Sequence, residues 1–367
     1  MIDIYKDLIY LLSCSINDIS LDKSRIKFMD LDQLYKLSKH HSVVAIVNIV
    51  LEKNGIKDER FHQAYKKSIR KNILLDIERT LILGEFEKNG IWYMPLKGCI
   101  LKDFYSSDGM RQMADNDILF DETKREEVKN IMLSHGYVVK EFDKSNHDVY
   151  MKPPVLNFEL HTNLFNTPNI ETFNKYYLNI KKMMKKDKNN KFGYHFTAED
   201  FYVYITAHEW KHYNFSGTGI RSLVDCYVYL NNKNDKLDWK YINEQLKQLG
   251  ISEFEEKRRK LAMKIFSNDR LSKLNDDDVE LLTFYLSSGT YGTYENTVKK
   301  KLKKHSKISF WVHSIFIPRK LMNVLVPFTE KSPLLYPFGV IYRCFYILFF
   351  KRDKIKLAIK VVKKYGK

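Results

Sequence analysis

The stretch RQMADNDILF, residues 111–120, decides the fold of this chain, because two acidic side chains stand at the start of a short apolar run. In a β-strand, side chains at positions i and i+2 point to the same side and lie about 6–7 Å apart. Asp115 and Asp117 would therefore project together, while Ile118 and Phe120 help to anchor the end of the strand. The segment predicts a strand that carries a pair of carboxylates.

A third carboxylate lies in LNFELHTNL, residues 156–164, which alternates as a half-buried strand does. Phe158 and Leu160 share one face, so Glu159 points to the other. If the two strands pair, three carboxylates converge and repel one another, and Mg²⁺ or Mn²⁺ would relieve that repulsion. His161 points to the same side as Glu159, where it either orients the glutamate or a metal-bound water or makes a structural hydrogen bond.

The sequence around these strands is mostly helical in its apolar spacing, which predicts an α+β fold with a small α/β core embedded between helical regions. Asn-Gly pairs at 54–55 and 89–90 are typical of helix C-termini. The expected parts are an N-terminal helical region, the α/β core, a C-terminal helical domain and a basic, aromatic-rich extension, at residues 1–90, 91–195, 196–290 and 291–367.

Positive charge is concentrated at the C-terminus. Residues 299–367 hold 18 Lys and Arg against Glu330 and Asp353, whereas the other 298 residues carry 44 basic and 43 acidic groups. Such a segment attracts nucleic acid or an anionic membrane surface. A lysine-rich solvated surface without a partner remains an open alternative.

The cysteines and the N-terminus bear on the compartment. The four cysteines lie far apart and form no CxxC pair, as expected of free thiols in a reducing environment. The first 15 residues place acids where a signal peptide has basic residues. We expect a cytoplasmic protein, with peripheral attachment to a membrane as the open alternative.

The apolar run LLYPFGVIYRCFYILFF, residues 334–350, raises the question of a membrane helix. A spanning helix needs about 20 apolar residues without a central charge, and Pro337 and Arg343 interrupt this run. Flanking Lys and Arg residues would suit a position at a membrane surface. Packing against the helical domain is the favoured interpretation.

The pentapeptide HEWKH, residues 208–212, matches the zinc-peptidase pattern, in which two histidines on one helix face bind the metal. The segment that follows supplies no third histidine, which argues against a peptidase. We instead expect polar side chains on two adjacent helices to face the carboxylates. They would bind phosphates or the acceptor, or form a buried network that ties Arg221 or His212 to Asp225. These side chains are His208, Lys211, His212, Arg221 and Asp225.

Taken in order, these segments resemble the uncharacterised nucleotidyltransferase family of the DNA polymerase β-like superfamily, over roughly residues 25–290. The order and spacing of the motifs carry the resemblance. The motifs are Leu96-Lys97-Gly98, Arg111, Asp115-x-Asp117, Gly136-Tyr137, Glu159-Leu160-His161, His208, Lys211-His212, Arg221 and Asp225.

The resemblance implies a small mixed sheet that holds Mg²⁺ or Mn²⁺ and a nucleoside triphosphate. By this similarity, Asp115 and Asp117 would ligate two metal ions, while Glu159 would ligate the second and help to activate the acceptor hydroxyl. Backbone amides after Lys97-Gly98 would cradle the phosphates. The implied nucleotide-binding residues are Lys97, Gly98, Arg111, His212 and Arg221. The implied reaction moves a nucleoside monophosphate to a hydroxyl acceptor and releases pyrophosphate.

Two departures from the superfamily pattern leave an alternative open. Cys99 follows Gly98 where a serine is usual, and Asn116 replaces an apolar residue between the aspartates. We expect the strand to begin only at Asp117 or to be exposed on its far side. Either departure is compatible with a weak or inactive fold that serves as a nucleotide-binding, RNA-binding or membrane-surface adaptor.

Overall fold

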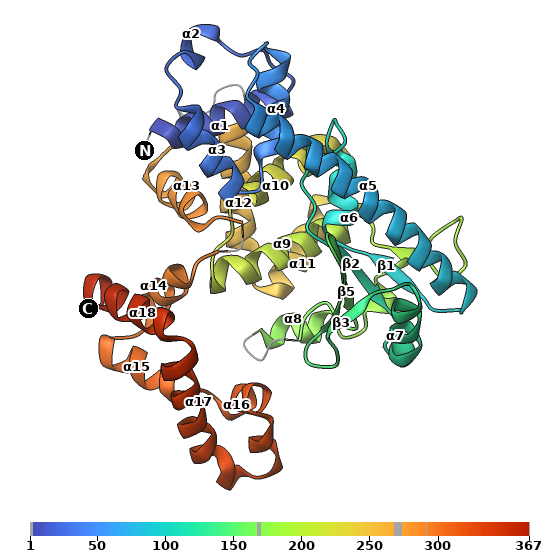
Figure 1. Ribbon diagram of the computed structural model, residues 1–367, viewed down its shortest axis with the longest axis vertical. Coiled ribbons are helices and arrows are strands. Elements are labelled where there is room, and N and C mark those ends of the chain that lie inside the picture. The colour runs from blue at the N-terminus through green and yellow to red at the C-terminus, as the bar shows by residue number, and fades with distance from the viewer. Residues whose placement is uncertain (1–2, 167–169, 268–273, 291, 367) are drawn as a thin grey trace.

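The computed structural model describes residues 3–166, 170–267, 274–290 and 292–366, and its helices surround one five-stranded sheet (Figure 1). The sheet is small and mixed, so the α+β class predicted from the sequence is confirmed. The strands are β1 (Tyr93–Pro95), β2 (Asn116–Phe120), β3 (Val138–Glu141), β4 (His147–Lys152) and β5 (Leu156–His161).

The order of strands in the sheet is β1-β2-β5-β4-β3, and only β2 and β5 run parallel. Their register pairs Asp117 with Glu159 and Ile118 with Leu160. Because neighbouring positions point to opposite faces, the sheet has an acidic patch on one face and an apolar layer on the other.

The long helix α5 (Glu59–Lys88) and the shorter α7 (Arg125–Ser134) pack on the apolar face of the sheet. Asp58 caps α5 by accepting a hydrogen bond from the backbone amide of Arg60. The helix ends at Asn89 and Gly90, the latter with φ of 67°, so the C-terminus predicted at this Asn-Gly pair is confirmed. The short helix α6 (Gly98–Leu101) follows β1.

The helices before and after the sheet share one hydrophobic core, so the N-terminal and C-terminal helical regions are not independent. Leu8 and Leu12 of α1, for example, belong to the same core as Leu261 and Ile265 of α12. The N-terminal helices are α1 (Asp3–Ile16), α2 (Lys23–Ile26), α3 (Leu31–His40) and α4 (Val44–Lys53). The later ones are α8 (Glu171–Tyr176), α9 (Ala198–Phe215), α10 (Ile220–Lys233), α11 (Trp239–Leu249), α12 (Ser252–Phe266) and α13 (Asp276–Ser288). A two-stranded ribbon pairs β6 (Lys185–Lys186) with β7 (Tyr194–His195).

The C-terminal helices project from this body as a separate arm (Figure 1). The arm joins the body where the amide of Thr293 donates to the carbonyl of Ser216 at 2.7 Å and Asn296 donates to Ser288 at 2.8 Å. Its helices are α14 (Tyr294–Lys304), α15 (Lys307–Ile315), α16 (Arg319–Leu325), α17 (Tyr336–Phe350) and α18 (Arg352–Tyr365).

The apolar helix α17 is the main departure from the expected packing. The segment Pro333–Phe350 is only 11% buried, so the prediction that residues 334–350 pack against the helical domain is wrong. The physical reason is the turn between α16 and α17, which folds α17 back on its own arm. There Val340 joins a small cluster around Met322, and most of the helix faces solvent.

Candidate functional site

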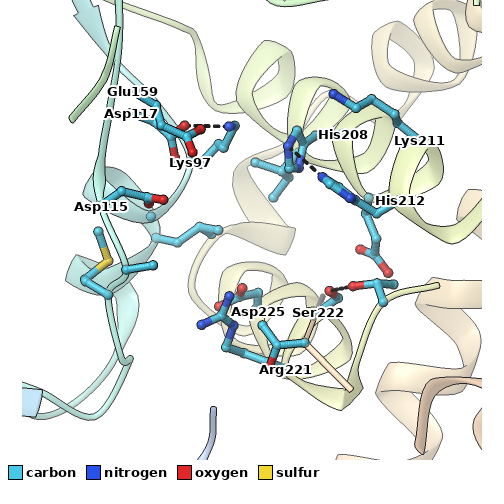
Figure 2. Close-up of a pocket in the computed structure, with 18 of the residues that line it drawn as sticks. Lys97, Asp115, Asp117, Glu159, His208, Lys211, His212, Arg221, Ser222 and Asp225 are labelled. Carbon is cyan, nitrogen blue, oxygen red and sulfur yellow. Dashed lines mark hydrogen bonds and ion pairs between the residues drawn. The ribbon is translucent and has the colours of Figure 1, made fainter. Parts of the chain in front are cut away.

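The acidic face of the sheet brings two of the three predicted carboxylates together. The parallel pairing of β2 and β5 sets Asp117 beside Glu159, and His161 follows on the same side. One ligand atom from each of these three side chains lies within 4.8 Å of the others. Asp115 precedes β2 on the same cavity wall (Figure 2). It lies outside this group of three, whose third member is His161.

Lys97 is the internal counter-ion of this cluster. Its Nζ donates to Oδ1 of Asp117 at 2.5 Å. Burial alone would lower the pKa of Lys97, but attraction to Asp117 outweighs burial and holds that pKa above its usual value. Lys97 also has φ of 44°, a strained conformation for a residue with a Cβ that costs about 1–3 kcal/mol. The surrounding fold therefore holds this ammonium against Asp117.

His161 fixes the second side of Asp117. Its Nε2 lies 2.8 Å from Oδ1 of Asp117, and its Nδ1 lies 3.4 Å from the amide nitrogen of Asn146. Burial and the nearby Lys97 lower the pKa of His161 to about 4, so the ring is neutral at pH 7. These partners assign the proton to Nε2, which donates to Asp117. Glu159 is farther away, at 3.9 Å, so the ring orients the aspartate rather than the glutamate.

The three carboxylates titrate differently because their surroundings differ. Burial would raise the pKa of Asp117, but Lys97 and His161 outweigh it and hold that pKa below its usual range. Burial raises the pKa of Glu159 to about 7, with repulsion from Asp117 adding to the effect. The same two causes raise the pKa of Asp115 to about 6. A metal ion at this wall, in addition to Lys97, would therefore supply positive charge to Glu159 and Asp115, the two carboxylates whose pKa values are raised.

Helices α9 and α10 supply the opposite wall of a cavity of about 400 Å³, in the size range of small-molecule sites (Figure 2). His208 and His212 face each other with their Nε2 atoms 3.3 Å apart, and burial lowers the pKa of both. Burial and the charge of Lys97 lower the pKa of Lys211. Arg221 donates to the carbonyl of Gln112 at 3.2 Å. The cavity thus has an acidic side and a basic side.

Arg111 forms a buried ion pair with Asp225. Its Nε and Nη2 donate to the two carboxylate oxygens at 2.7 and 2.9 Å, and the Tyr105 hydroxyl donates to the same carboxylate at 2.6 Å. Asp225 is therefore held chiefly by Arg111, which the buried-network interpretation did not include, and the charge of Arg221 also helps to lower the pKa of Asp225. The expected role of Arg111 in neutralising a triphosphate stays a prediction. In the structure, the charge of Arg111 is already balanced by that of Asp225.

The turn at Lys97-Gly98 differs from the expected phosphate cradle. The amides of Cys99 and Ile100 donate at 3.1 Å to the carbonyls of Leu96 and Lys97, so these amides are already engaged. Gly98 lies in close contact with other side chains, since a Cβ there would lie 2.8 Å from Nη1 of Arg111 and from Cε of Met113. In the structure, the side chains of Arg111 and Met113 lie against Gly98, where phosphates were expected.

Neither departure from the family pattern reaches the cavity. Strand β2 begins at Asn116, which is fully buried, so the expected start at Asp117 and the expected exposed far side are both wrong. The reason is α5, because the Asn116 amide donates to the carbonyl of Leu75 and accepts from Arg79. Cys99 points the same way, with its Sγ 3.5 Å from Oδ1 of Asn116.

Glu209 of the HEWKH pentapeptide is bound inside the helical domain. It forms an ion pair with Arg258 at 2.7 Å and accepts from the Tyr285 hydroxyl at 2.6 Å. Within the described ranges, the cluster around Asp117 is the only group of metal-ligating side chains. Glu209 is thus already paired with Arg258 and Tyr285, rather than free to act as the base of a zinc peptidase.

His147 is a site residue that the sequence analysis missed. It begins β4 opposite His161, and its Nε2 lies 4.0 Å from Oε2 of Glu159. The antiparallel pairing of β4 with β5 is the signal that would have placed this histidine at the site. Its Nδ1, like Oε1 of Gln112, is buried without a hydrogen-bond partner in the described part of the chain, as expected of a ligand-facing wall.

Comparison with protein families gives a match over most of the chain. The profile of a family described as uncharacterised nucleotidyltransferase matches residues 28–267, well over half of the chain and the whole of the cavity wall built by the sheet, α9 and α10. No curated protein and no solved structure matches the chain.

Proposed function

This chain belongs to the uncharacterised nucleotidyltransferase family, and from that premise we propose that it transfers a nucleoside monophosphate from a nucleoside triphosphate to a hydroxyl acceptor, with release of pyrophosphate. The observation that carries the proposal is the compact group formed by Asp117, Glu159 and His161 on one wall of the cavity. The basic wall across the cavity supports it, because a triphosphate needs cationic partners beside its metal.

The donor set fits a divalent cation. Asp117 and Glu159 would hold it, with Asp115 beside them, and carboxylate oxygens are the ligands that Mg²⁺ prefers. His161 would orient Asp117 toward the cation through its Nε2–H. When bound, the cation supplies positive charge to the phosphate oxygens and to the attacking oxygen.

The protein side chains provide the remaining functions. Glu159, on the wall beside the cation, would accept the proton of the acceptor hydroxyl. The acceptor oxygen then bonds to the α-phosphorus as the bond to pyrophosphate breaks. Lys211 and Arg221 lie on the wall where the leaving phosphates would be held. Before the cation binds, Lys97 and His161 keep Asp117 ionised and oriented.

One observation favours the alternative of a nucleotide-binding protein without transfer. The ammonium of Lys97 lies 2.5 Å from Asp117, on the carboxylate that would hold a metal ion. If the Lys97 ammonium stayed on Asp117 permanently, it would take the place of the metal ion. The protein would then bind a nucleotide without transferring it.

Incubation with each α-labelled nucleoside triphosphate, Mg²⁺ or Mn²⁺ and cell extract tests the proposal. Transfer predicts that one acceptor becomes labelled while pyrophosphate is released in equal amount. Calorimetric binding of a nucleotide without any labelled product would support the binding protein, and absence of both binding and labelling would reject both functions.

We expect Mg²⁺ or Mn²⁺ to raise the melting temperature by several degrees at about pH 8 and by less than half of that at about pH 6. Asp115 and Glu159 have raised pKa values, so the metal-free folded state binds protons that the unfolded state has lost. Its stability therefore falls as pH rises from about 4 to about 7, and the cation restores stability above that window. Thermal scans with and without metal measure the difference. A shift that is equal at both pH values, or is unchanged in Glu159→Gln, would contradict this assignment.

A further inference from the structure

The arm formed by residues 294–365 exposes an unusually apolar helix. Within the described residues, Pro333–Phe350 is the one segment long and apolar enough to qualify as a membrane helix, and only 11% of it is buried. Helix α17 places large side chains at three- and four-residue spacing toward solvent. Those more than half exposed are Phe338, Ile341, Tyr342, Phe345, Leu348, Phe349 and Phe350. Contiguous apolar surface of this kind marks a site of interaction.

The two residues that interrupt the apolar run add no charge to the exposed face of α17. Pro337 stands in the first turn of α17, where a missing amide hydrogen costs nothing. Arg343 turns inward and donates to the carbonyls of Ser314 and Ile315 at 2.8 and 3.2 Å, at the end of α15. The solvent-facing side of α17 is therefore free of charge.

The helix that follows α17 presents a cationic surface. Helix α18 buries Ala358, Val361 and Val362 in a small cluster with α14 and α15. Its basic residues consequently remain in solvent. They are Arg352, Lys354, Lys356, Lys360, Lys363 and Lys364, next to the exposed Lys351.

We propose that this arm docks on an anionic lipid bilayer, with α17 lying in the plane of the interface and the lysines of α18 contacting lipid headgroups. An apolar helix face flanked by basic residues is the arrangement that binds such surfaces. The inference does not depend on the proposed enzymatic activity, because no residue of the cavity takes part.

The packing of α17 within the arm favours the in-plane position over a spanning one. Helix α17 alone has 15 residues and reaches about 22 Å, short of the roughly 30 Å hydrocarbon layer, so a spanning segment would need the turn at Pro333–Leu335 as well. The opposite face packs on Met322 of α16, and Arg343 is tied to α15, so a spanning helix would carry a charge and a second helix into lipid.

Charge and chemistry distinguish lipid from other occupants of this face. A second copy would bring two strongly basic arms together, and like charges repel. Nucleic acid phosphates would bind the lysines, but they would leave the aliphatic side chains of Ile341 and Leu348 exposed to water. Anionic lipid complements both the charge and the apolar face.

Flotation of the full-length protein with vesicles tests the proposal. We expect flotation with vesicles that contain phosphatidylglycerol and at least tenfold less with phosphatidylcholine alone. The variant Phe345→Ser/Phe349→Ser and the variant Lys356→Glu/Lys360→Glu/Lys363→Glu should each lose at least tenfold. These side chains are exposed, so the variants should fold as the parent does, which circular dichroism checks.

Matched controls come from the body of the protein. Phe28→Ser removes an aromatic ring that is 90% exposed, and Lys236→Glu/Lys240→Glu/Lys247→Glu changes as many exposed lysines. Both controls should float as the parent does. Absence of flotation, or equal loss in test and control variants, would overturn the proposal.

Three further results would assign the face to something else. RNA binding in place of flotation, dependent on the lysines but not the phenylalanines, would indicate nucleic acid. Dimerisation without lipid that the phenylalanine variant abolishes would indicate a second copy. Resistance to extraction by alkaline carbonate would indicate a spanning helix and overturn the in-plane position.

Discussion

Glu159→Gln is expected to lower the rate of nucleotidyl transfer about 1,000-fold while leaving the folded protein at least as stable as the parent at about pH 8. Loss of a general base typically costs 10²–10⁴-fold, and this residue would also lose its charge toward the cation. The stability expectation has the opposite sign, because burial and repulsion from Asp117 and Asp115 disfavour the ionised glutamate. A neutral amide of the same size removes that repulsion. Initial rates of labelled transfer and thermal unfolding at the same pH measure both effects.

The opposite signs of the two effects make this variant informative. A change that simply damaged the fold would lower activity and stability together. Glu141→Gln is the matched control, since Glu141 is an exposed glutamate on β3 of the same sheet and should leave both quantities unchanged. Full transfer activity in Glu159→Gln would remove this carboxylate from the reaction, and a lowered melting temperature would show that its charge stabilises the fold.

Local sequence patterns predicted the parts of the site that depend on strand geometry. Alternation in NFELH was enough to put Glu159 and His161 on one side, and apolar flanks were enough to identify β2 and β5 as strands. The Asn-Gly pairs likewise marked where α4 and α5 end. In each case the information lies within a few residues of the feature that it determines.

The other features of the site and fold depend on contacts between segments far apart in the chain. A single sequence does not show which of several possible contacts form. Arg111 and Asp225 lie 114 positions apart, and the sequence offered Arg221 and His212 as equally good partners for that aspartate. Asn116 looked like an exposed polar residue because nothing in the strand shows that α5 will cover it. The apolar run of α17 has the composition of a core helix, and only its surroundings make it a surface one.

Glu209→Ala is expected to cost about 3–5 kcal/mol of unfolding free energy, the largest stability effect that we predict for the helical domain. The change leaves the guanidinium of Arg258, which is 1% exposed, without its carboxylate partner. It also removes the acceptor of the Tyr285 hydroxyl, so the polar contacts of Glu209 that connect α9 with α12 and α13 are lost. Denaturant unfolding measures the cost. Glu253→Ala is the control, because its exposed pair with Lys257 on α12 contributes less than about 1 kcal/mol.

A double variant separates the charge effect from the loss of packing. Replacing the pair with apolar residues, as in Glu209→Leu/Arg258→Met, removes both charges, and such replacements of buried ion pairs are often neutral. If the unpaired guanidinium causes the instability of Glu209→Ala, the double variant should recover most of the lost stability. Recovery would establish that the glutamate of HEWKH serves the fold, whereas a double variant no more stable than the single one would place the cost in the cavity left by the side chain.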